Sequence, residues 1–396
     1  MTDDNSYRWK ILIATYLASF AFGMTLQSVP PVIPLLIKDF GITHAEAGLA
    51  MSLLALPMIF FSIPVGRLAD RHGPKIVGLF AFATLVAGDL VVASSTSFPV
   101  LLAGRAVAGA GAFTLVLISP QLISQWFVGK EIGVAMGIWN TAFPLATVIS
   151  LSTMGPVGQA LSWRAPIVIG TAAAILAMIV FVLLVRPHPV DHRGPAVRQS
   201  VVSALRRAGT PIWFVGAAWL FFNAASLSFM AFAPDYFQSE GHSTSMAGLL
   251  AGMILWGTFF GSPLVGLLLD RGQRPEVLMI IGSVGLAATL LLVPAFPSVV
   301  VPVLLLGAVV SSFIVVSVFS LPPSLLDPSL IGLGYGILAT CLNIGTAVGP
   351  FLVGVIRDFS GAYTVSLWGM AAMALLVAAS ASRLMASRKA APEAMG

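Results

Sequence analysis

Two charged residues stand inside long apolar stretches, where an ionisable side chain needs a chemical reason. Arg105 lies in an apolar run near 98–120, and Asp89, which we take as the only acid inside such a run, lies in the preceding run near 76–95. An ionisable group in this setting indicates a role in binding or proton transfer. If both runs are helices that rise 1.5 Å per residue, the two side chains lie about 9–10 Å from the same end. We therefore expect Asp89 and Arg105 to pair.

Two interpretations of this pair are open. In the first, the two charges form a structural clamp between neighbouring helices. In the second, Asp89 exchanges protons, and Arg105 changes its proton affinity as the conformation changes, because a nearby opposite charge favours ionisation. Arg105 is also a fixed cation, which favours a small anion as the substrate.

The composition shows which elements must position these residues. Of the 396 residues, 58% are hydrophobic and only 9% are charged, against about 25% charged in an ordinary soluble protein. This excludes a soluble enzyme, a nucleic-acid-binding protein and a disordered scaffold. The chain is predicted to be a membrane protein with several spans.

A spanning helix needs about 20 apolar residues, and runs of this kind predict an all-α membrane protein with twelve transmembrane helices. The runs lie near 11–36, 47–66, 76–95, 98–120, 132–155, 165–185, 211–234, 246–269, 277–294, 298–321, 333–356 and 361–382. The polar segment 186–210 separates two groups of six. We expect an N-terminal half over 1–185, a cytoplasmic linker over 186–210, and a C-terminal half with a short tail over 211–396.

Most of the 20 lysines and arginines fall on one side if both termini are cytoplasmic, and Lys38, Arg164 and Arg357 fall in external loops. Positive residues favour the cytoplasmic side, so we predict a multi-pass protein of the plasma (inner) membrane. The net charge of +5 then needs no nucleic-acid partner.

The two halves repeat each other in chain order. The matches are 47–49 with 247–249, Gly66-Asp70-Arg71 with Gly266-Asp270-Arg271, 99–104 with 302–307, and Gly155 with Gly354. Duplicated halves are typical of secondary transporters that expose a central site alternately to each side.

The segment Gly66-Arg-Leu-Ala-Asp70-Arg71-His-Gly73-Pro-Lys75 resembles the cytoplasmic loop motif of the major facilitator superfamily, and Gly266-Leu-Leu-Leu-Asp270-Arg271-Gly272 is a weaker copy. With the repeats, the resemblance covers residues 8–385. It implies two pseudo-symmetric six-helix halves around a central cavity. It also implies a conformational latch formed by Gly66, Asp70, Arg71 and Gly73.

In the latch interpretation, Gly66 lets two helices approach closely, and Asp70 lies near the helix start at 332–336, where negative charge is favoured. In the alternative, these charges only anchor the topology.

Further motifs point to coupling and to the substrate. Arg105 followed by Gly109 and Gly111 resembles a motif of proton-coupled members of the superfamily. Gly155-Pro156-Val-Gly158 and 345–350 partly resemble a motif of drug antiporters, although the first copy lacks the preceding glycines. The opening segment, from Tyr7 to Pro34, is similar to bacterial uptake porters for cyanate and other small anions. Nitrate porters, however, carry substrate arginines in helices 2 and 8, and this chain has none within those spans.

Polar and aromatic residues in the predicted pore-side helices are candidates for substrate binding or coupling beside Arg105 and Asp89. They are Gln27, Trp139, Asn140, Asn223, Trp256 and Asn343. The amides can equally bond between helices, and the tryptophans can simply be packed. Pro30, Pro31 and Pro34 predict a kinked or unwound end of the first helix.

The five histidines fall in loops or at span ends without metal-ligand spacing, and no phosphate-binding loop is found. We expect no metal, no cofactor and no enzymatic activity, and a sensor would need a signalling domain that we do not find.

The sequence thus predicts a monomeric, proton-coupled secondary transporter, by symport, of a small organic anion across the lipid bilayer. The alternative is a proton-coupled multidrug efflux antiporter.

Overall fold

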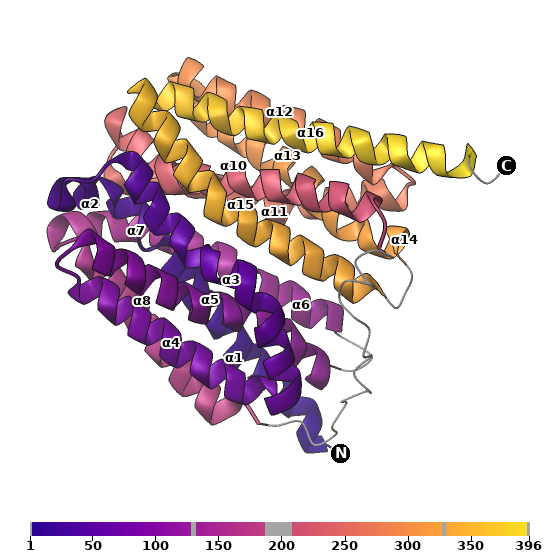
Figure 1. Ribbon diagram of the computed structural model, residues 1–396, viewed down its shortest axis with the longest axis horizontal. Coiled ribbons are helices and arrows are strands. Elements are labelled where there is room, and N and C mark those ends of the chain that lie inside the picture. Colours follow the sequence, from indigo (N-terminus) through magenta and orange to yellow (C-terminus); the bar gives the residue numbers. More distant parts are fainter. Residues whose placement is uncertain (1, 128–131, 187–207, 327–329, 394–396) are drawn as a thin grey trace. The chain divides into compact units, whose positions relative to one another are not determined.

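The computed structural model describes residues 2–127, 132–186, 208–326 and 330–393, and within them all regular elements are helices (Figure 1). The predicted linker, 186–210, falls almost wholly outside these residues, so the predicted boundaries of the two halves stay a prediction.

Helices fill both parts of the chain. The first part contains α1 (Thr2–Gln27), η1 (Pro30–Val32), α2 (Ile33–Phe40), α3 (His44–His72), α4 (Pro74–Ser94), α5 (Phe98–Trp126), α6 (Ile132–Asn140), α7 (Ala142–Ala160) and α8 (Arg164–Leu184). The second part contains α10 (Pro211–Ser239), α11 (Thr244–Asp270), α12 (Pro275–Ala295), η2 (Pro297–Val299), α13 (Val300–Ser320), α14 (Pro322–Leu325), α15 (Ile331–Ser360) and α16 (Tyr363–Glu393).

Each predicted apolar run coincides with helix. Within the described residues, ten helices are long and apolar enough to cross a membrane. The run at 132–155 is instead broken into α6 and α7 at Thr141, whose hydroxyl donates to the Ile138 carbonyl at 2.7 Å. The run at 246–269 lies wholly within α11. The predicted break after the first helix is confirmed, since α1 ends at Gln27 and η1 follows at Pro30.

The helices extend beyond the apolar runs, and this corrects one prediction. Asp235 lies within the span Pro211–Ser239, and Asp358 lies within Leu333–Ser360. The expectation that Asp89 is the only acid inside a span is therefore wrong. A helix keeps its hydrogen-bonded geometry past the last apolar residue, so hydropathy alone places its end too early.

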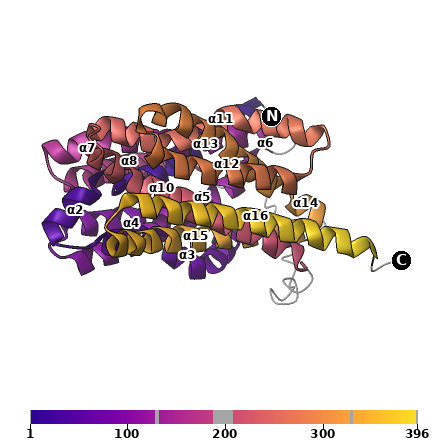
Figure 2. The same cartoon turned by 90° about the horizontal axis from the view of Figure 1, so that it is seen from above.

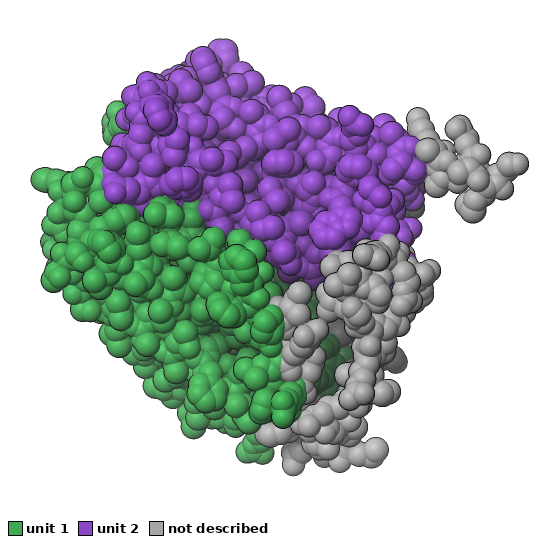
Figure 3. Space-filling model, viewed as in Figure 1, with its two compact units in different colours: residues 1–42, 49–196, 237–249 green, residues 43–48, 197–236, 250–396 purple. Residues whose placement is uncertain are grey.

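The helices form two compact units (Figure 3). Unit 1 comprises residues 1–42, 49–196 and 237–249, and unit 2 comprises residues 43–48, 197–236 and 250–396. In unit 1, α1 packs on α5, α7 and α8, and α4 packs on α5 and α8. In unit 2, α12 packs on α13 and α16, and α12 and α16 run side by side (Figure 1, Figure 2).

Glycines from the sequence repeats mark matching helix contacts in the two units. In unit 2, a Cβ on Gly48 would clash with the Pro350 carbonyl, and one on Gly354 would clash with the His44 carbonyl. In unit 1, a Cβ on Gly248 would clash with the Leu151 carbonyl, and one on Gly155 would clash with the Thr244 side chain. The first turn of α3 therefore packs on α15, and the first turn of α11 packs on α7. The repeated glycines are explained by these two close approaches.

Candidate functional site

Small residues bring α4 and α5 together and so position the two buried charges of unit 1. A Cβ on Gly88 of α4 would clash with the backbone of Ala108, and one on Gly104 of α5 would lie 2.8 Å from the Val92 side chain. Small residues let helix backbones approach closely in membranes. Asp89 follows Gly88 and Arg105 follows Gly104 in the sequence, so this approach places both charged residues along one helix contact.

Arg105 is completely buried and binds to two other helices. Its Nε donates to the Ala50 carbonyl of α3 at 3.1 Å, and its Nη1 donates to the Thr25 carbonyl of α1 at 2.9 Å. Nη2 lies 3.8 Å from the sulfur of Met51. These carbonyl acceptors hold the guanidinium within unit 1, although none of them carries a full negative charge.

Asp89 is 1% exposed and is held by the same threonine. The Thr25 hydroxyl donates to Asp89 Oδ2 at 2.9 Å. The other carboxylate oxygen, Oδ1, is buried and has no hydrogen-bond partner among the described residues. Asp89 and Arg105 form no direct ion pair within the described part of the chain. Thr25 instead connects them, with its hydroxyl on Asp89 and its carbonyl on Arg105.

This arrangement can do proton chemistry. Removing a carboxylate and a guanidinium from water costs several kcal/mol each, by order of magnitude, unless each is compensated. Arg105 provides the countercharge for Asp89, but Asp89 Oδ1 receives no hydrogen bond from a described donor. A carboxylate in this position can reduce its desolvation cost by taking up a proton. The group Asp89–Thr25–Arg105 is therefore a candidate proton-exchange site.

Two of the other predicted residues of unit 1, Gln27 and Asn140, are the last residues of their helices. Gln27 is buried at the end of α1, where its backbone carbonyl accepts a hydrogen bond from the Ser150 hydroxyl at 2.9 Å. Trp139 packs against a buried cluster that includes Leu12 and Phe127, which favours the packing interpretation. Asn140 is exposed at the last residue of α6.

In unit 2, Asn223 and Asn343 are buried, and Asn223 donates to the Trp219 carbonyl of its own helix at 2.7 Å. The side chain of Trp256 lies outside the described residues.

The structure describes only some of the side chains in the predicted latch motif. Gly73 has a φ of +85° and Gly272 has a φ of +83°, a left-handed conformation that favours glycine. These glycines are therefore explained by the turns that they form. A Cβ on Gly66 would meet no described atom within 4 Å, so the close helix approach expected there is not found. The Asp70 side chain lies outside the described residues, Arg71 is exposed, and the latch stays a prediction.

The sequence alone did not reveal three features of the structure. Thr25 connects the two charges but is 64 positions from Asp89 in the chain. In unit 2, an aromatic cluster is formed by Trp219, Phe222, Phe319 and Tyr335. Trp219 stacks on Phe222 at 5.4 Å and meets the edge of Phe319 at 5.1 Å, and Phe319 stacks on Tyr335 at 6.3 Å. A second polar group, around His44, is described below.

Known proteins resemble this chain along its length. A family model described as the Major Facilitator Superfamily matches residues 15–350 and, in a second match, 217–394. The 4-hydroxybenzoate transporter PcaK of Pseudomonas aeruginosa is 27% identical over 219 residues, which are 52% of this chain and only 45% of that protein. The matched region is thus less than half of the length of that relative.

Two further comparisons cover nearly the whole chain. The uncharacterized MFS-type transporter YtbD of Bacillus subtilis is 23% identical over 398 residues, covering 98% of this chain and 99% of that protein. The structure of a bacterial homologue of the human lysosomal transporter Spinster has a TM-score of 0.77 at 18% identity and covers 96% of this chain and 97% of that one. Given its apolar helices and these matches, the chain is a multi-pass integral membrane protein that belongs to the Major Facilitator Superfamily of transporters.

Proposed function

We propose that the protein is a secondary active transporter that couples the movement of a small organic anion to protons by alternating access. The observation that carries this proposal is the buried group in which Thr25 connects Asp89 to Arg105. The Asp89 oxygen without a described donor supports proton uptake at this carboxyl.

The charges of this group suggest how a proton and an anion are coupled. With Asp89 ionised, its charge balances that of Arg105. When Asp89 takes up a proton, Arg105 keeps its charge and the buried group becomes net positive. An uncompensated buried charge is costly, so a nearby anion stabilises the protonated state. Binding is reciprocal, because the anion must favour the proton as much as the proton favours the anion. The expected result is symport.

The name of one relative and the sign of the fixed charge support an organic anion. The similar protein PcaK is named for 4-hydroxybenzoate, an aromatic carboxylate. Arg105 is 0% exposed here, so we assign it to coupling through its charge. Direct contact with a substrate would require a conformation in which Arg105 becomes accessible.

The test uses purified protein in liposomes that contain a pH dye. An inward pH gradient is expected to drive accumulation of a carboxylate such as 4-hydroxybenzoate, with acidification of the lumen. Asp89→Asn imitates the neutral carboxyl, so it is expected to keep anion exchange between the two sides and to lose accumulation driven by the gradient. Arg105→Ala is expected to lose both activities.

Retained gradient-driven accumulation in Asp89→Asn would remove Asp89 from the coupling site. A wild-type protein that accumulates neither 4-hydroxybenzoate nor any other small carboxylate tested would contradict the anion proposal. Thr153→Ala is a suitable control, since this exposed residue of α7 donates its hydroxyl to Ile149 of its own helix.

The second candidate function is proton-coupled efflux of amphipathic drugs, which the aromatic cluster of unit 2 favours. Trp219 and Phe222 are 6% and 8% exposed, whereas Phe319 and Tyr335 are 43% and 37% exposed. Stacked rings that extend from a buried to an exposed position are typical of pockets for aromatic ligands. Proton release that is driven only by lipophilic cations, and lost in Trp219→Ala, would favour efflux over uptake.

A further inference from the structure

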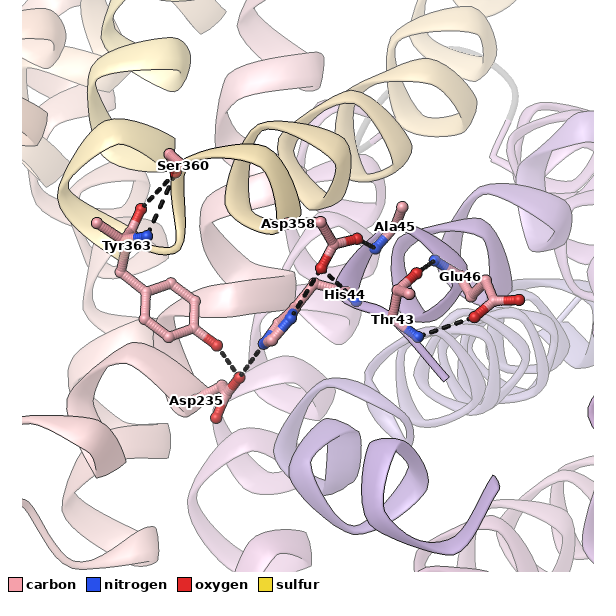
Figure 4. Close-up of polar contacts among 9 residues, drawn as sticks. Thr43, His44, Ala45, Glu46, Asp235, Asp358, Ser360 and Tyr363 are labelled. Carbon is pink, nitrogen blue, oxygen red and sulfur yellow. Dashed lines mark hydrogen bonds and ion pairs between the residues drawn. The ribbon is translucent and has the colours of Figure 1, made fainter. Parts of the chain in front are cut away.

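A histidine of unit 2 lies between two carboxylates (Figure 4). His44, the first residue of α3, has its Nδ1 3.1 Å from Asp358 Oδ1 of α15 and its Nε2 3.5 Å from Asp235 Oδ2 of α10. The side chains of His44, Asp235 and Asp358 are 21%, 15% and 27% exposed. Each ring nitrogen therefore faces its own acidic partner in a setting that is only partly open.

The same contact attaches the start of α3 to α15. The Asp358 carboxylate accepts the backbone N–H of His44 at 2.9 Å and that of Ala45 at 2.7 Å. Free N–H groups at a helix N-terminus favour an anionic partner. Asp358 thus caps a helix that is not its own, and anything that alters Asp358 or His44 changes how firmly the first turn of α3 is held.

The hydrogen-bond inventory determines which form of His44 fits. An ionised carboxylate only accepts hydrogen bonds, and a neutral imidazole donates from one nitrogen only. A neutral His44 would therefore satisfy one carboxylate and point a lone pair at the other. An imidazolium donates its Nδ1–H to Asp358 and places its positive charge 3.5 Å from Asp235 Oδ2, where the two form an ion pair. We propose that His44 is a second proton-binding site, separate from Asp89, and that its protonation fastens the first turn of α3 to α15.

The charged and titratable groups around His44 favour this assignment. Asp235 comes from α10 and Asp358 from α15, while Tyr363 of α16 donates its hydroxyl to Asp235 and meets the His44 ring edge-on at 5.8 Å. The Arg357 guanidinium lies 4.3 Å from the centre of the Tyr363 ring. Glu46 of α3 instead accepts the N–H of Thr43 at 2.8 Å within its own capping box. Two carboxylates therefore face the imidazole directly, at 3.1 and 3.5 Å.

The sequence repeat provides a neutral counterpart in unit 1. The first turn of α11 packs on α7 through Gly248 and Gly155, as the first turn of α3 packs on α15. At the matching positions, Thr244 replaces His44 and Gln159 replaces Asp358. The described hydrogen bonds there are neutral: Ser245 donates to the Ser152 carbonyl at 3.1 Å, and Gln159 donates to Gln238 at 3.3 Å. One helix attachment is therefore ionisable, and its counterpart is not.

The test is amide hydrogen exchange of the intact protein in lipid nanodiscs, with protection factors corrected for the intrinsic pH dependence of exchange. In the wild type, protection over residues 41–51 is expected to fall about tenfold between about pH 5 and pH 8, as one charge-assisted hydrogen bond is lost. Residues 245–251, which begin after His242, serve as the internal control and are expected to keep constant protection.

Two variants distinguish this proposal from a general effect of pH. His44→Gln cannot gain a charge, so its protection over 41–51 is expected to be low and constant. Asp235→Asn lets a neutral His44 donate to Asp358 and accept from the amide, so it is expected to lose most of the pH dependence, and it tests the proposal even if His44→Gln fails to fold. An equal fall in the wild type and in either variant would overturn the proposal, as would constant protection in the wild type. Because the measurement involves no substrate, its result is independent of the transport proposal.

Discussion

At the scale of single residues, Thr25 is the centre of the candidate coupling site, because both of its polar groups are used there. Its hydroxyl donates to Asp89 and its carbonyl accepts from Arg105. Helix geometry was enough to place Asp89 and Arg105 at similar depths from the sequence. It could not identify Thr25, because this connection depends on how α1 packs against α4 and α5.

We predict that Thr25→Val weakens proton-coupled uptake about tenfold, because a hydrogen bond to an ionised group is worth about 1.5–3 kcal/mol. Valine has nearly the same shape as threonine and keeps the backbone carbonyl for Arg105. Thr25→Ser retains the hydroxyl and should retain uptake. The measurement is the initial rate of gradient-driven uptake in liposomes, and equal rates for the two variants would show that the hydroxyl is not needed.

At the scale of helices, the apolar runs predicted where helices lie, but not where they end or break. The helices α10 and α15 extend past the predicted apolar runs, and the added residues include Asp235 and Asp358. The polar group around His44 was therefore not predicted. The break between α6 and α7 at Thr141 precedes Pro144, which cannot donate to the carbonyl of Asn140 four residues earlier. Patterns of residue types indicate burial, whereas hydropathy alone does not place the ends of helices, which are themselves assigned only to within one or two residues.

Helix contacts make a second prediction, on stability. A valine at Gly88 would clash with the backbone of Ala108, whereas a side chain at Gly66 would meet no described atom. Gly88→Val is therefore expected to lower the free energy of unfolding by at least about 1–3 kcal/mol, the usual cost of overpacking. Gly66→Val should change it little. Thermal unfolding of the purified variants in detergent checks both, and a strong loss of stability in Gly66→Val would restore the close-packing interpretation of that glycine.

At the scale of the whole molecule, the two halves share packing positions but differ in charge. Arg105 in the first half corresponds to Ala308 in the second. The two repeats are offset by 203 residues at this point, against 200 residues at Gly66 and Gly266. His44 in α3 corresponds to Thr244 in α11. The duplicated glycines thus maintain a common helix packing, while ionisable groups are found at only one of the two matching positions.

The last prediction concerns the transport cycle as a whole. If the motif around Asp70 is a latch, Asp70→Asn should reduce the maximal transport rate about fivefold, because a carboxylate at a helix N-terminus is worth about 1 kcal/mol. The KM should change little, since Asp70 lies in the last turn of α3 and not in the coupling group, and conformational steps often limit turnover. Asp270→Asn is the matched variant in the second repeat, where the motif is weaker, and a smaller effect is expected. Initial rates over a range of substrate concentrations separate the two parameters. An unchanged maximal rate in Asp70→Asn would leave these charges as topology anchors, whereas a raised KM would move the motif into the substrate pathway.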